Sequence, residues 1–119
     1  MPHRDWKLRI KDIVDAINAI QGYTEGMKYK TFVADRKTVD AVIRNLTVIG
    51  EAAGQVPDDI VSAYPDIPWR DMRDMRNFVV HEYFGISDKI IWDTVHKNLP
   101  PLIPVLKPFL ISEDPDTNS

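Results

Sequence analysis

The sequence contains no cysteine, which excludes disulfide scaffolds, zinc ribbons and thiol nucleophiles. It also lacks any run of about 18 uncharged apolar residues, the length that a membrane-spanning helix needs. The first residues, Met1 to Trp6, carry no apolar core of the kind that secretory signals have. Membrane insertion and secretion are therefore disfavoured, and we expect a cytoplasmic protein.

Positive charge is not in excess either, because 15 Lys and Arg residues stand against 18 Asp and Glu residues, for a net charge of −3. Tight, sequence-independent binding of nucleic acid usually requires a basic surface that releases counterions from phosphates. The chain is therefore not a general polyanion binder. Contact with RNA or DNA must come from a local cluster of Arg and Lys, from a partner, or from the assembly of several copies.

What the sequence does contain is apolar residues at the helical period. A chain of 119 residues with 44% hydrophobic residues has room for one domain with one core. Apolar stripes and end signals predict helices over 6–22, 35–54, a short one from 57, 69–83, and from 88 with a break at Leu99–Pro100; 24–33 is a short helix or a turn. We expect an all-α, up-and-down bundle of four to five helices over residues 1–111, and a disordered tail over 112–119.

The segment from Arg70 to Tyr83 divides into two faces at about 100° per residue. The face expected to join the core consists of Met72, Met75 and Val79. The opposite face concentrates Arg70, Arg73, Arg76, Asn77 and His81. Val80 and Phe84 lie within that polar face, which implies that it is partly buried. In so short a chain the simplest surface to bury it is a second copy, so we expect a two-fold homodimer.

A motif in this segment is similar to that of a known family. The run Arg76-Asn77-Phe78-Val79-Val80-His81-Glu82-Tyr83 resembles the R-x4-H-x-Y motif of HepT-like toxins in the HEPN superfamily of helical ribonucleases. Further blocks in the same order extend the resemblance over most of the chain; they lie at 41–46, 49–53, 67–71 and 98–102.

The resemblance implies a HEPN-like fold and a metal-independent ribonuclease, the toxin of a type VII toxin–antitoxin system, which dimerises through the motif helix. Arg76 and His81 would be catalytic, and Asn77 and Arg73 would support RNA binding. Tyr83 would be adenylylated by a nucleotidyltransferase antitoxin of the MntA type. The added bulk and negative charge beside the arginines should block RNA. No cofactor and no metal ion is implied.

The residue types fit this chemistry independently. Cleaving RNA without a metal ion requires a base for the 2′-hydroxyl and a cation for the phosphate. The imidazole of His81 suits the first role, since histidine titrates near pH 6.5, close to the operating range. The planar guanidinium of Arg76 holds two phosphate oxygens more specifically than a lysine would. Asn77, four residues before His81, would orient the ring or contact the phosphate.

Structural explanations are preferred for several other polar residues. Arg70 and Asp74 stand four residues apart and are expected to form a surface ion pair. Arg73 is as consistent with packing as with an RNA contact. Arg44 and Glu51 are expected to form a buried polar contact that supports the motif helix.

Aromatic and histidine residues outside the motif are also expected to be structural. Trp69 and Trp92 should pack against the core. His3 and His96 lack partners at metal-ligand spacing, and His96 should be exposed.

A second hypothesis belongs to another functional class, that of a non-catalytic helical module that binds a nucleotidyltransferase and contributes a dimer interface. Cleavage of RNA in EDTA distinguishes the two hypotheses, because the module would leave RNA intact.

Overall fold

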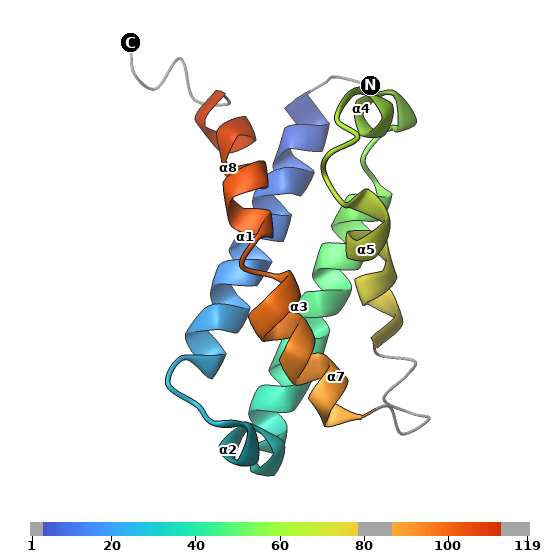
Figure 1. The fold of residues 1–119 in the computed structure, drawn as a ribbon. Helices are drawn as coiled ribbons and strands as arrows, with labels where there is room; N and C mark the ends of the chain where they lie inside the picture. The colour runs from blue at the N-terminus through green and yellow to red at the C-terminus, as the bar shows by residue number, and fades with distance from the viewer. Residues whose placement is uncertain (1–3, 79–86, 113–119) are drawn as a thin grey trace.

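The computed structural model describes residues 4–78 and 87–112, and its regular elements are helices. They are α1 (Arg4–Thr24), α2 (Tyr29–Ala34), α3 (Arg36–Gly54), α4 (Asp58–Ala63), α5 (Trp69–Asp74), the 3-10 turn η1 (Met75–Asn77), α7 (Asp88–Asp93), the π-turn η2 (Thr94–Asn98) and α8 (Leu102–Ser112). No strand occurs in these two ranges, so the prediction of an all-α bundle is confirmed (Figure 1). The predicted tail beyond Ser112 lies outside the described residues.

The helices α1 and α3 form the centre of the bundle and lie side by side along their lengths (Figure 1). All six apolar positions of the first predicted stripe are buried: Trp6, Ile10, Ile13, Val14, Ile17 and Ile20. The stripe of the second long helix is buried as well, at Val39, Val42, Ile43, Leu46, Ile49 and Ala53. Both long helices are thus confirmed, and their packed stripes form most of the core.

The corner between α2 and α3 is closed by the side chain of Asp35. The Thr38 backbone N–H donates to Asp35 Oδ1 at 3.1 Å, and the Thr38 hydroxyl donates to Oδ2 at 2.8 Å. Asp35 therefore caps α3, whose predicted start near this residue is confirmed. The hydroxyl donor, followed by the backbone donor, lowers the pKa of the Asp35 carboxyl.

The segment after 86 follows the predicted last helix, including its break. Ser87 caps α7, since its hydroxyl oxygen accepts from the Lys89 backbone N–H at 3.0 Å. The helix then widens into η2, where the Leu99 N–H donates to the Thr94 carbonyl at 3.1 Å. The two prolines that follow have no backbone donor, so the helix stops and resumes as α8 beside α1. None of the described helices is both long and apolar enough to span a membrane.

The predicted buried contact between Arg44 and Glu51 is wrong, because both side chains are exposed. On an ideal helix these residues lie about 140° and 120° from Val39, which is at the centre of the buried side of α3. The same helical periodicity that predicted this helix therefore places Arg44 and Glu51 on its solvent-facing side. The face of α3 that supports α5 and η1 carries small residues instead.

Candidate functional site

The helix that carries the predicted motif begins at a buried tryptophan. Trp69 is 4% exposed, and its indole N–H donates to the Tyr64 carbonyl at 3.0 Å. Met72 and Met75 are also buried, so their predicted place in the core is confirmed. Val79, the third residue of the predicted core face, lies outside the described residues.

This helix is not uniform over its described length. Trp69–Asp74 is α-helical, and Met75–Asn77 tightens into a 3-10 turn. A 3-10 turn advances about 120° per residue instead of about 100°. Around the helix axis, Arg76 and Asn77 are therefore rotated further from Arg73 than an ideal α-helix predicts.

The backbone of Arg76 is held against α3 by a glycine. A Cβ atom placed on Gly50 would lie 2.6 Å from the Arg76 Cβ and 2.9 Å from its Cα, and would also collide with its backbone nitrogen. One turn further along α3, a Cβ on Gly54 would lie 3.5 Å from the Arg76 Nη1. Gly50 therefore allows the Arg76 backbone to pack closely against α3, and Gly54 leaves room for the Arg76 guanidinium beside it.

The three arginines of the segment differ in burial. Arg70 and Arg76 are exposed, and Arg73 is half-buried. The Nε atom of Arg73 is buried and has no hydrogen-bond partner among the described residues. The predicted ion pair between Arg70 and Asp74 is not formed, although both residues are described and exposed. The arginine side chains of this helix are therefore not neutralised by carboxylates of the described chain.

The remaining predicted site residues divide between described and undescribed positions. Asn77 is exposed at the end of η1, close to Arg76 in sequence. His81 and Tyr83, like Val80 and Phe84, lie outside the described residues. The described part of the site therefore supplies the cationic and amide groups.

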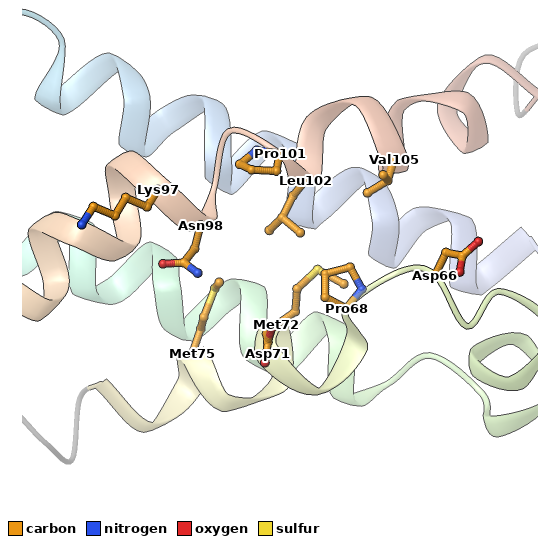
Figure 2. Close-up of a pocket in the computed structure, with 10 residues that line it drawn as sticks. All are labelled: Asp66, Pro68, Asp71, Met72, Met75, Lys97, Asn98, Pro101, Leu102 and Val105. Carbon is orange, nitrogen blue, oxygen red and sulfur yellow. The ribbon is translucent and has the colours of Figure 1, made fainter.

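A cleft of about 310 Å³ lies on the methionine side of the same helix. Figure 2 shows Met72 and Met75 on one side, opposite Asn98 and Leu102 from the C-terminal segment. Asp66, Asp71 and Lys97 also line it. Arg70, Arg73, Arg76 and Asn77 are not among its lining residues. The basic face and this cleft are therefore separate features.

Gly50 is the residue of the candidate site whose contact with Arg76 the sequence did not predict. Its place in the buried stripe of α3 indicated packing, but nothing in the spacing indicated which backbone would meet it. Adjacent small residues at 50 and 52–54 were the available signal, because small residues permit close approach of two backbones.

Comparison with known proteins gives consistent matches. A family model described as "Ribonuclease HepT-like" matches residues 13–109. A Methanocaldococcus jannaschii protein with the provisional name of an RNase is 41% identical over 100 residues, which cover 84% of this chain and 83% of that protein. A Thermococcus cleftensis protein named as a probable ribonuclease HepT is 40% identical over 100 residues, covering 84% and 88%. No solved structure matches the chain.

Proposed function

Because the chain belongs to the ribonuclease HepT-like family, we propose that it cleaves RNA without a metal ion. Arg76 and His81 are the catalytic residues of this proposal, and Asn77 and Arg73 support RNA binding. The observation that carries it is the exposed guanidinium of Arg76, whose backbone is held by Gly50 and which no described carboxylate neutralises.

The described geometry suits the role of a phosphate-binding arginine. A rigid backbone limits the orientations of the guanidinium, and its planar donors match two oxygens of one phosphate. In the proposed reaction His81 accepts the proton of the RNA 2′-hydroxyl, the 2′-oxygen forms a bond to phosphorus, the bond to the 5′-oxygen breaks, and the departing 5′-oxygen takes up a proton from water. Arg76 stabilises the charge that develops on the phosphate oxygens.

The proposal includes a homodimer in which the two motif helices face each other. Its support is the exposed basic face of this helix, where Arg70 and Arg76 form no ion pair with a carboxylate of the described residues. A second copy placed against this face would bring the arginines of both chains to one RNA strand. Light scattering at micromolar concentration should give twice the mass of the chain, and a monomer would contradict the shared site.

Regulation by a nucleotidyltransferase follows as the finer part of the proposal. In it the chain is the toxin of a type VII toxin–antitoxin pair, and an MntA-type antitoxin transfers AMP from ATP to the hydroxyl of Tyr83, releasing pyrophosphate. The adenylate would place negative charge near the arginines and repel RNA. Mass spectrometry after incubation with the neighbouring nucleotidyltransferase and ATP should find AMP on the Tyr83 peptide. Modification only at other residues would remove this switch.

The activity is tested by incubating the purified chain with RNA in EDTA. Cleavage is expected, and His81→Ala should abolish it while the helical circular dichroism and the dimer mass stay unchanged. Cleavage by His81→Ala at the rate of the unaltered chain would contradict the assigned base. Intact RNA at high protein concentration would favour the non-catalytic module that binds a nucleotidyltransferase.

A further inference from the structure

Three aromatic rings form a continuous surface at the corner between α2 and α7–η2. The Trp92 ring lies 4.0 Å from the His96 ring, at 38° between their planes. Tyr29 meets the same Trp92 ring edge-on, with 5.8 Å between ring centroids. We name Tyr29, Trp92 and His96 the aromatic platform. Tyr29 and His96 are exposed and Trp92 is half-buried.

The packing of this corner does not require the outer rings. Phe32 is fully buried, and its ring lies 5.1 Å from that of Trp92, so it already anchors α2 to α7. Tyr29 remains 37% exposed beside this anchor. Outside it, the His96 Nδ1 lies 2.9 Å from the Trp92 carbonyl oxygen, which fixes the imidazole across the indole. The outer rings therefore present aromatic area to the surroundings in a fixed arrangement.

Positive charge surrounds the platform although the whole chain is acidic. Residues 28–37 contain four cations, Lys28, Lys30, Arg36 and Lys37, against one carboxylate, Asp35. Lys28 and Lys30 flank Tyr29 in the sequence. Both are exposed, and neither forms an ion pair with a carboxylate of the described residues. Lys97 follows His96 but lines the cleft on the methionine side. The pKa of the Asp93 carboxyl is lowered by its hydrogen bond with Lys89 and further by the charge of Lys97, so Lys97 has a carboxylate nearby. The corner thus offers both rings and two lysines without an ion-pair partner.

The platform lies at one end of the molecule. Figure 1 shows α2 and α7 at the end opposite α4. Next to the platform lies a hollow of about 540 Å³, lined by His96 of η2, by Gln21 near the end of α1, and by Glu25 and Met27, which follow α1. Arg36 of α3 holds the start of α7 through a 3.1 Å ion pair to Asp88.

We propose that the aromatic platform stacks the bases of single-stranded RNA while Lys28 and Lys30 hold its backbone, as a substrate-binding site separate from Arg76 and His81. The proposal rests on the proposed ribonuclease function. Exposed rings within a basic surface are the usual means of binding unpaired strands without sequence preference. Base-paired RNA does not offer its base faces, so the site selects single strands.

Binding is measured with a short single-stranded 2′-O-methyl oligoadenylate, because the methyl group blocks the oxygen that would attack phosphorus. Trp92 reports binding by fluorescence, since Trp6 and Trp69 are buried. The oligomer should quench Trp92, and Tyr29→Ala and His96→Ala should each weaken binding about tenfold. An abasic oligomer of the same length should bind much more weakly. Equal binding of the two oligomers would overturn the stacking role.

Matched controls separate this role from general effects on folding. Tyr64 is 40% exposed and packs on other rings, but it follows α4 at the opposite end of the molecule (Figure 1). Tyr64→Ala should leave RNA binding unchanged. Lys28→Ala and Lys30→Ala should weaken binding and reduce its salt dependence, whereas Lys107→Ala in α8 should not. If Tyr29→Ala changes the oligomeric mass and not RNA binding, the surface is a contact between copies and the proposal fails.

Kinetics on a cleavable strand distinguish failure of the platform from failure of the ribonuclease assignment. Tyr29→Ala should raise KM about tenfold and leave kcat unchanged, because the platform does not touch the reacting atoms. If Tyr29→Ala cleaves RNA with an unchanged KM, the platform proposal fails while the ribonuclease assignment stands. Binding that depends on Tyr29 without any cleavage would leave the platform and remove the catalytic assignment.

Discussion

The two basic regions of the molecule hold their charge in different ways. On the motif helix the cations are arginines, and Arg76 is fixed at its backbone by contact with Gly50. At the corner of α2 and α7 the cations proposed to bind RNA are Lys28 and Lys30, on flexible stems beside the aromatic platform. A fixed planar guanidinium suits one phosphate in one geometry, whereas mobile ammonium groups attract a strand in many registers. The comparison therefore sharpens the two proposals, in which the motif helix is the site for chemistry and the corner of α2 and α7 is the site that binds the strand.

The strongest test of this comparison removes the fixed guanidinium. Arg76→Ala should lower the single-turnover cleavage rate by about 100-fold to 1,000-fold, because a positioned donor to the phosphate is lost. Arg76→Lys should recover only part of the rate, since an ammonium group cannot hold two oxygens in a plane. Arg70→Ala is the matched control on the same helix and should retain nearly full activity. An equal loss in Arg70→Ala would mean that only total charge matters.

A smaller loss of activity is expected from a substitution at Gly50, which packs against the Arg76 backbone. Gly50→Ala places a methyl group against the Arg76 backbone and should destabilise the fold by about 1–3 kcal/mol, as overpacking does. It should also lower kcat, because the guanidinium moves with its backbone. Urea unfolding and cleavage rates check both effects.

The same substitution elsewhere is the control for Gly50. Gly22 lies within α1 and a Cβ there would meet nothing within 4 Å, so Gly22→Ala should be neutral or stabilising. Gly54→Ala should be tolerated, since its Cβ would make ordinary contact with Arg76. A Gly50→Ala variant as stable and active as Gly22→Ala would show that close packing of the Arg76 backbone against α3 is not needed for stability or activity.

The ion pair between Arg36 and Asp88 should contribute little to the stability of the corner between α2 and α7. Arg36 and Asp88 are 3.1 Å apart, with side chains 53% and 25% exposed. A double-mutant cycle with Arg36→Ala and Asp88→Ala should give a coupling of about 0.2–1 kcal/mol that falls with added salt. A coupling of several kcal/mol would place this corner among the rigid regions and weaken the contrast with the motif helix.

The smallest expected effect is the pH dependence of the stability that the Asp35 cap gives to the start of α3. The Thr38 hydroxyl lowers the pKa of Asp35 below its ordinary value of 3.8, so the cap stabilises the fold above about pH 4. This stabilisation is lost as the pH falls through the lowered pKa. Thr38→Val should reduce the melting temperature at pH 7 more than at low pH. Parallel melting curves for the two proteins across this range would contradict the assignment.

The sequence was sufficient for the features that depend on neighbours along the chain. Helical periodicity predicted the buried stripes of α1 and α3, and local end signals predicted where α3 and α7 begin, at the residues that Asp35 and Ser87 cap. The prolines at 100 and 101 predicted the break before α8. These features follow from residues a few positions apart, where helix geometry fixes which groups meet.

Features that join distant segments could not be predicted in the same way. The contact of Gly50 with Arg76 and the edge-on contact of Tyr29 with Trp92 depend on how helices pack, and periodicity carries no information on that. The 3-10 turn at Met75–Asn77 was missed because an ideal helix was assumed through the motif. Arg44 and Glu51 were misplaced for a different reason, since the wheel of α3 already put them on its outer side.

The glycine under the arginine has a consequence for recognising active members of the family. A relative with every letter of R-x4-H-x-Y intact, but with a larger residue at the position of Gly50, would keep the motif while its arginine is displaced. Counting motifs would then overestimate the number of working nucleases. The residue on the facing helix deserves to be examined together with the motif when copies are sorted into active and degenerate forms.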